Sequence, residues 1–253
     1  MRTSDSAMAL AVAGAIAVTV SGSAGAQSGN REDWKFVATP YVWLTALEGT
    51  VGVGPLASSV DLGATDVFRM LKWGIMGAGE GRKGPYVVGL DAIHASLGTG
   101  RSLAIRGDTG SLEFSLRETI IQPVAGYAFG DSALGVDLLA GMRYWNLGTT
   151  LDVDRTRRPS NERAMTQQWV DATGGFRFRW IPLERVRFAA AADGGGGGSR
   201  ETWQVSSSLG FDAWSKWTLG VAYRVLAVDY ARNDFLFDTR TEGFVVGATW
   251  RSP

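Results

Sequence analysis

Residues 170 to 180, VDATGGFRFRW, alternate between apolar and polar positions with a period of two. In an extended chain Val170 and Phe176 fall on one face, and Asp171 and Arg177 fall on the other. A helix would mix these two sets, because its side chains repeat every 3.6 residues. The stretch therefore predicts a β-strand with one apolar face and one polar face.

The same alternation returns over nearly the whole chain after residue 33. The segments that show it are residues 34–47, 73–83, 85–98, 111–130, 133–145, 185–194, 203–212, 217–230 and 239–251. Those over 73–83, 85–98 and 111–130 alternate less regularly than the rest. Together with residues 170–180 they predict an all-β chain of about ten strands, although eight or twelve strands also fit.

Aromatic residues and connection lengths favour a barrel that crosses a membrane. Apolar faces carry aromatic residues near strand ends, as expected where strands cross two lipid interfaces: Trp34, Trp180, Trp203, Trp217, Tyr223 and Trp250. Short connections (83–85, 130–132, 181–185, 214–216) alternate with long ones (47–72, 98–110, 151–166, 231–238). We therefore predict an antiparallel transmembrane up-and-down β-barrel. A secreted β-sandwich or a lipocalin-like barrel is the alternative.

The first 26 residues read as a secretory signal peptide. Arg2 precedes a short apolar run over residues 9–20, and Ala24-Gly25-Ala26 matches a small-x-small cleavage pattern. The apolar run is shorter than the ~20 residues of a spanning helix, which argues against the alternative of an N-terminal membrane anchor. We expect export, cleavage after Ala26, and a single domain over residues 27–253.

Composition limits the partners and the chemistry. Lys plus Arg and Asp plus Glu are 25 each, so the chain has no net basic field for nucleic acid. The chain has no cysteine and a single histidine, which limits metal and nucleophilic chemistry. We therefore predict no cofactor, no metal and no nucleic-acid partner.

Several segments resemble a family of small, largely uncharacterised Gram-negative outer-membrane β-barrel proteins. The resemblance rests on a PYVW start (40–43), a GMRYW strand (141–145) and a YRVLAVDY strand (223–230), and it covers nearly all of the mature chain. It implies an outer-membrane location, contact with lipid and lipopolysaccharide, and insertion by the barrel-assembly machinery. Such chains often end on an aromatic residue, whereas here Arg251-Ser252-Pro253 follow Trp250.

In a membrane barrel the polar face of each strand lines the interior. The predicted interior charges are nearly balanced: Lys35, Arg82, Arg117, Arg143, Arg177, Arg179, Arg187 and Arg224 against Glu80, Asp91, Glu113, Asp137, Asp171, Asp193 and Asp212. A barrel of about ten strands is close to the size that its own side chains fill. Two interpretations stay open: a packed, structural ionic interior, or a narrow passive pore for ions and very small solutes.

One short motif raises the alternative of an enzyme. His94 and Ser96 lie on the same face of one predicted strand, which by this register points toward lipid near the outer interface. A histidine base beside a serine nucleophile, with Asp108 or Glu113 as the orienting acid, resembles outer-membrane lipid A deacylases. This would be an interfacial lipid A-modifying hydrolase, whereas a lone histidine in the polar girdle is the plainer interpretation.

The connections carry four further expectations. Residues 50–63 suggest a protruding hairpin, and Asp66 could cap a short helix over residues 65–73. Arg155, Arg157, Arg158 and Arg163 could contact lipopolysaccharide phosphates from an outward loop. The pentaglycine at residues 194–198 is expected to end one strand and form a hairpin, because the alternation continues on both sides. The sequence does not indicate an oligomeric state.

Overall fold

The computed structural model describes residues 33–53, 56–105, 108–155, 158–232 and 234–253, of which residues 53, 56, 99–105, 108–114, 151–155 and 158–164 are described by their backbone alone. The chain forms eleven strands and one short helix in the order β1 (Lys35–Val53), β2 (Leu56–Leu62), α1 (Ala64–Met70), β3 (Leu71–Lys83), β4 (Tyr86–Ile105), β5 (Asp108–Gly130), β6 (Leu134–Arg155), β7 (Arg158–Leu183), β8 (Val186–Gly197), β9 (Glu201–Trp214), β10 (Trp217–Arg232) and β11 (Phe235–Arg251).

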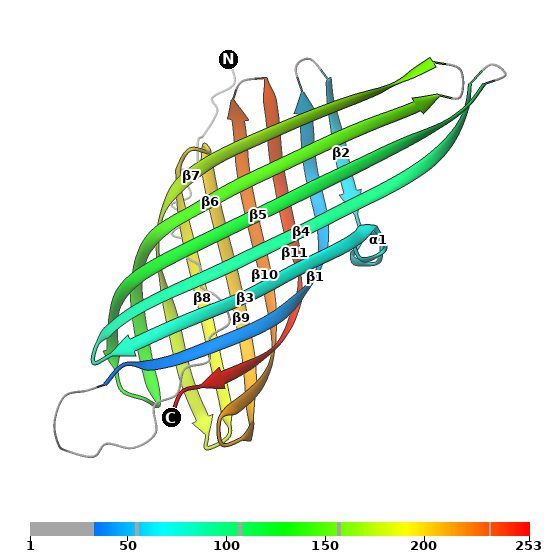
Figure 1. Cartoon of the computed structure of the whole chain (residues 1–253). Coiled ribbons are helices and arrows are strands. Elements are labelled where there is room, and N and C mark those ends of the chain that lie inside the picture. Colours follow the sequence, from blue (N-terminus) through cyan, green and yellow to red (C-terminus); the bar gives the residue numbers. More distant parts are fainter. Residues whose placement is uncertain (1–32, 54–55, 106–107, 156–157, 233) are drawn as a thin grey trace, which may run out of the picture.

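Ten of these strands close into an antiparallel barrel (Figure 1). From β3 to β11 each strand pairs with its neighbour in the sequence, and β11 pairs with β1 along nearly its whole length. The short strand β2 folds back on the upper part of β1 and forms the predicted hairpin. The prediction of an up-and-down barrel of about ten strands is therefore confirmed.

Alternation along each strand decides which side chains face the interior. On β6, Leu134, Val136 and Leu138 are exposed on the outer wall, whereas Asp137 and Arg143 are buried inside. The other strands follow the same inside-out pattern, with apolar residues outward and polar residues inward. This pattern is the reverse of a water-soluble β-sandwich.

Tight turns join the strands at the end of the barrel that holds the C-terminus. Gly84 and Gly130 have positive φ angles (56° and 88°) at two of these turns, a conformation that glycine adopts without steric cost. At the opposite end β4, β5, β6 and β7 extend beyond the other strands (Figure 1).

Three of the predicted long loops are wrong. Residues 231–232 belong to β10 and residues 235–238 belong to β11, and these two strands pair up to Arg232↔Phe235. The segments 98–110 and 151–166 continue as strands, because β4 pairs with β5 up to Ile105↔Asp108 and β6 pairs with β7 up to Arg155↔Arg158. Ladder pairing satisfies the backbone groups there without any need for a regular apolar face. The residues between β4 and β5 and between β6 and β7, with Arg157, lie outside the described residues.

The helix α1 differs from its predicted form at its N-terminus. Its N-cap is Gly63, not Asp66, and Asp66 lies in the first turn, where its backbone N–H donates to the carbonyl of Gly63 (2.9 Å). A carboxylate in the first turn still complements the helix dipole. No helix within the described ranges is both long and apolar enough to cross a membrane.

The C-terminal residues form part of the closing seam. Trp250 pairs with Ala38 of β1 and with Trp217 of β10. Beyond β11, the backbone N–H of Ser252 donates to the carbonyl of Phe36 (2.8 Å), and the N–H of Phe36 donates to Ser252 Oγ (2.9 Å). The residues after Trp250 therefore extend the β1–β11 pairing.

Candidate functional site

The first interior cluster lies near the tight-turn end of the barrel and centres on Asp137. This carboxylate is fully buried and accepts hydrogen bonds from Arg82 (2.6 Å), Arg177 (2.7 Å) and Arg179 (3.1 Å). Glu80 completes the cluster through ion pairs with Arg82 and Arg177 (2.6 Å each). Three guanidinium groups therefore share two carboxylates across the barrel.

The second cluster crosses the middle of the interior around Arg143. Arg143 forms an ion pair with Asp193 on β8, and Gln122 Nε2 donates to the same carboxylate (2.6 Å). Arg143 also donates to Gln122 Oε1 (3.1 Å) and to Thr202 Oγ1 (2.7 Å). These side chains come from four different strands, so the cluster spans the interior.

The third cluster holds Arg224. Its guanidinium donates to Asp91 (2.8 Å), Tyr41 Oη (3.2 Å) and Gln204 Oε1 (2.6 Å). Tyr41 in turn donates to Asp91 (2.6 Å), and the guanidinium lies 4.8 Å from the centre of the Trp43 ring. The carboxylate of Asp91, the phenol of Tyr41 and the ring face of Trp43 together offset the desolvation cost of the buried guanidinium.

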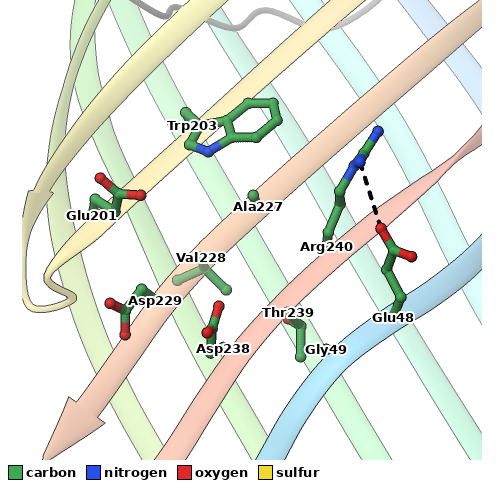
Figure 2. A pocket seen from close by; sticks show the side chains of 10 residues that line it. All are labelled: Glu48, Gly49, Glu201, Trp203, Ala227, Val228, Asp229, Asp238, Thr239 and Arg240. Carbon is green, nitrogen blue, oxygen red and sulfur yellow. Dashed lines mark ion pairs between the residues drawn. The ribbon is translucent and has the colours of Figure 1, made fainter. Parts of the chain in front are cut away.

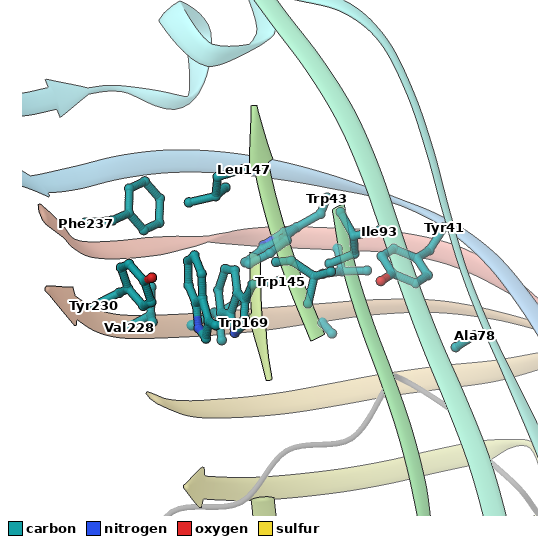
Figure 3. Packing of buried hydrophobic residues seen from close by; sticks show 14 of the residues in the cluster. Tyr41, Trp43, Ala78, Ile93, Trp145, Leu147, Trp169, Val228, Tyr230 and Phe237 are labelled. Carbon is teal, nitrogen blue, oxygen red and sulfur yellow. The ribbon is translucent and has the colours of Figure 1, made fainter. Parts of the chain in front are cut away.

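An aromatic cluster lies among the buried hydrophobic residues of the interior (Figure 3). On the inward faces, Trp145 is the next residue after Arg143 on β6 and Trp169 is the residue before Asp171 on β7, and the two indole rings stack at 5.5 Å. Tyr230 stacks on Trp169 at 4.0 Å. The indole Nε1 of Trp169 donates to Asp171 (3.0 Å), which also caps the backbone N–H of Ser199 (2.7 Å). The interior is therefore occupied by apolar packing above a layer of paired charge.

A fourth ionic cluster lies at the rim of the tight-turn end. Asp212 accepts hydrogen bonds from Arg187 (2.5 Å), Thr218 (2.5 Å) and Arg251 (2.9 Å). Its side chain is partly exposed beside a surface pocket of about 350 Å³ that includes Arg185 and Trp214. This cluster lies at the rim of the interior, whereas those around Asp137, Arg143 and Arg224 lie deeper inside the barrel.

Most of the predicted interior charges fall in these clusters, and two do not. The structure places the following on the interior side: Glu80, Arg82, Asp91, Asp137, Arg143, Asp171, Arg177, Arg179, Arg187, Asp193, Asp212 and Arg224. Lys35 is exposed at the rim. Arg117 is exposed outside the network, and the side chain of Glu113 lies outside the described part of the structure.

The error at Arg117 comes from the register of β5. Ile120 and Gln122 are buried inside, which places Thr119 and Arg117 on the opposite set of positions. The neighbouring residues Ile120 and Ile121 are both apolar, so alternation alone could not tell the two faces apart. Because the two faces of β5 were exchanged in the prediction, the inward-facing Glu118 was not predicted as an interior residue. Gln122 and Gln204 were also not predicted, because the interior residues were chosen by charge and these amides have none.

The geometry around His94 differs from that of a histidine–serine pair. His94 Nδ1 lies 2.8 Å from Thr119 Oγ1 on β5, and its ring lies 4.6 Å from the ring of Trp73. Ser96 is buried, although it falls on the same set of β4 positions as His94, and the described residues show no hydrogen bond between the two. The side chains of the suggested acids Asp108 and Glu113 lie outside the described residues.

A shallow acidic pocket of about 320 Å³ lies on the outer wall near the long-strand end (Figure 2). Its lining includes Glu48, Glu201, Trp203, Asp229, Asp238 and Arg240. Arg240 pairs with Glu48 (3.5 Å) and Glu242 (2.5 Å), and Arg200 pairs with Asp229 (3.4 Å). Within the described ranges no group of acidic or histidine side chains is arranged to hold a metal ion.

The outer wall is apolar on every side of the barrel. Exposed aliphatic residues lie on strands around the whole circumference, among them Val42, Leu44, Val88, Leu90, Leu138, Met142, Val205, Leu209, Leu219, Val221 and Val246. An aromatic ring surrounds the tight-turn end: Trp34, Phe36, Tyr86, Tyr127, Phe129, Trp180, Trp214 and Trp217. Of the predicted girdle residues, Trp203 and Trp250 are half-buried instead of exposed.

Comparison with known proteins leaves the family open. No protein-family model matches the chain, and no curated protein matches it. Among solved structures, the translocator domain of the autotransporter NalP from Neisseria meningitidis is 12% identical, with a TM-score of 0.40 over 89% of this chain and 90% of that one. The attachment invasion locus protein Ail of Yersinia pestis, in complex with the heparin analogue sucrose octasulfate, is 11% identical, with a TM-score of 0.33 over 87% and 98%. The toluene transporter TbuX of Ralstonia pickettii is 10% identical, with a TM-score of 0.28 over 89% and 90%. Because these sequence identities and TM-scores are low, the barrel assignment rests on the strand pairing within this chain.

Proposed function

We propose that the protein is an outer-membrane β-barrel with a closed interior. Its role is then structural or is carried out by its outer surface, and it does not act as a pore. The observation that carries the closed interior is the ion pair of Arg143 with Asp193 inside the barrel, with side-chain exposures of 0% and 2%. A conducting path would have to pass both this cluster and the stacked rings of Trp145 and Trp169.

The apolar wall supports the location in a membrane. A soluble protein rarely exposes a continuous apolar surface, because that surface would aggregate in water. Here the aliphatic belt surrounds the barrel and the aromatic ring borders it at one end, the arrangement expected for lipid contact. The tight turns would face the periplasm and the long strands β4 to β7 would face the outside.

The paired charges support a structural interior. Removing an ion from water costs several kcal/mol even after relaxation, so an unpaired interior charge would be costly. Asp137, Asp193 and Arg224 each have at least two hydrogen-bonding partners. These contacts cross from strand to strand and hold the wall together from within.

Planar-bilayer recording tests the closed interior. We expect the wild-type barrel to show no discrete conductance steps, and we expect steps after Arg143→Ala, Trp145→Ala and Trp169→Ala are combined to open the interior. The matched control carries Met142→Ala, Leu138→Ala and Val170→Ala on the outer faces of the same strands. Reproducible steps from the folded wild type would overturn the closed interior.

Fractionation tests the location separately. In a Gram-negative host we expect the mature chain to start at Gln27 and to sediment with the outer membrane. Recovery of a folded chain in the soluble periplasm would contradict the membrane assignment, whatever the conductance result.

A further inference from the structure

The barrel wall is incomplete between β1 and β3. The two strands pair from Lys35↔Arg82 to Pro40↔Gly77, and the ladder ends there. Farther along, residues 41–46 of β1 and 71–76 of β3 pair only with their other neighbours, β11 and β4. The wall therefore opens sideways over about six residues on each strand.

The sequence explains why the strands separate. Pro40 has no N–H to donate, so it ends a ladder without a lost hydrogen bond. Beyond it β1 takes β2 as its new neighbour from Leu47↔Leu62 onward, and α1 connects β2 back to β3. Because α1 packs mainly against β1, it lies over the opening without closing the ladder.

A pocket of about 160 Å³ occupies this opening. Apolar side chains make up most of its lining: Val42, Trp43, Leu44, Val67, Phe68, Leu71, Met76, Ile93 and Leu97. An apolar cavity of about 150 Å³ is large enough to bind benzene. The pocket therefore has the volume of a single small ring and not of a complete lipid chain.

Two polar groups at the pocket have no hydrogen-bonding partner among the described residues. The Glu118 carboxyl lines the pocket and makes no hydrogen bond or ion pair there, although Arg224 lies near enough to act on it electrostatically. Trp43 also lines it, and its buried indole Nε1 donates to nothing described. An occupant with a hydroxyl group would offer a donor to Glu118 and an acceptor to an indole N–H.

The mouth of the pocket meets the apolar outer wall. Phe68 on α1 is 63% exposed and Ile75 on β3 is 69% exposed, and Leu44 is exposed on β1. The neighbouring rings of Trp73 on β3 and His94 on β4 lie 4.6 Å apart. A ligand dissolved in the membrane would reach the pocket without passing through the barrel interior.

We propose that this lateral opening is a binding site for a small phenol-like molecule, one apolar ring bearing a hydroxyl group, which enters from the membrane. The proposal rests on the membrane location proposed above and not on the closed interior. The ring fills the apolar part between α1 and β4, and the hydroxyl donates to Glu118. A small apolar pocket with few convergent polar groups is the usual form of a small-molecule site.

Binding of 4-fluorophenol to the folded full chain in detergent micelles, followed by ¹⁹F NMR, tests this proposal. The comparison ligand is 4-fluorotoluene, which has nearly the same shape and lacks the hydroxyl group. We expect saturable binding of 4-fluorophenol that is about tenfold tighter than that of 4-fluorotoluene, since one hydrogen bond to a buried carboxyl group without another partner contributes about that factor.

Three variants locate the site. Glu118→Leu should weaken 4-fluorophenol binding about tenfold and leave 4-fluorotoluene nearly unchanged. Ala95→Phe should abolish binding of both ligands, because Ala95 lines the pocket and the added ring would fill it. Ala125→Phe is the matched control, since Ala125 is exposed on the outer face of β5. Circular dichroism and urea unfolding verify that each variant is folded.

Several results would overturn the proposal. Equal affinity for the two ligands would show that the hydroxyl group makes no specific contact. Binding that survives Ala95→Phe would show that the ligand binds elsewhere. Absence of saturable binding by the wild type would do the same. A photoreactive acyl-chain phospholipid that labels Leu71 and resists displacement by 4-fluorophenol would identify a membrane lipid as the occupant instead. None of these outcomes depends on conductance, so the closed interior is judged separately.

Discussion

Arg143 on β6 and Asp193 on β8 form an ion pair inside the barrel that bridges the intervening strand β7. The guanidinium also holds Gln122 and Thr202, so one side chain connects four strands. Both charges are almost completely buried, which makes each depend on the other.

Removing one member of this pair should cost far more than removing both. We expect Arg143→Met or Asp193→Leu alone to lower the free energy of unfolding by about 3–5 kcal/mol, because a buried charge loses its partner. The double variant should recover a large part of that loss. Urea unfolding of all four proteins in one detergent gives the coupling energy, and additive losses would show that the pair is not coupled.

The position of a carboxylate along the barrel should set its contribution to stability. Asp137 is fully buried among three arginines, whereas Asp212 is partly exposed at the rim. We expect Asp137→Asn to cost about 3 kcal/mol or more, and Asp212→Asn to cost about 1 kcal/mol, because solvent screens the rim cluster. Matched Asp-to-Asn unfolding curves measure both, and a larger loss at Asp212 would contradict the burial argument.

Two residues of the pentaglycine, Gly195 and Gly198, pack closely against β7. A Cβ on Gly195 would overlap the carbonyl oxygen of Ala172, and a Cβ on Gly198 would lie 2.7 Å from Trp169 Cβ. We expect Gly195→Ala to destabilise the barrel by more than about 1 kcal/mol. Gly174→Ala is the control, since its Cβ would lie 4.0 Å from its nearest neighbour and should leave stability equal or slightly higher. Equal effects from the two variants would show that the close approach does not matter.

The turn between β5 and β6 should respond to acid. Asp131 accepts hydrogen bonds from the backbone N–H groups of Leu134 (2.8 Å) and Ala133 (2.7 Å), and these bonds hold the pKa of its carboxyl below the ordinary value of an aspartate. A lowered folded-state pKa means that the stabilisation is present above the unfolded-state pKa and is lost as the pH falls through the folded-state pKa. Asp131→Ala should therefore be less stable than the wild type at neutral pH, and the difference should shrink in acid. NMR titration of the carboxyl and unfolding at both pH values measure this; a pKa at or above the ordinary value would contradict it.

The alternation of side chains predicted both the fold and the interior clusters where the pattern is regular. Asp137, Asp171 and Arg177 stand in segments whose apolar and polar sets are cleanly separated, and all three are buried inside. At Arg117 the adjacent isoleucines 120 and 121 made the two faces equivalent, so the register could not be chosen locally. The extensions of β4 to β7 over residues 98–110 and 151–166 were predicted as loops for a related reason, since the part of a strand outside the apolar belt needs no apolar face.

The sequence by itself determined that the chain is made of strands with one apolar and one polar face, because a period of two assigns side chains to faces wherever the alternation is regular. Tertiary structure alone decided which charges meet. Arg224 finds Asp91, 133 residues away, only after ten strands have closed with one particular stagger. It also decided that β1 leaves β3 after Pro40, because the competing partner β2 lies in a segment whose pairing no local pattern specifies. The side of the sheet to which a side chain points is a local property of its strand. Which strands and which side chains pair depends on the free energy of the whole closed sheet.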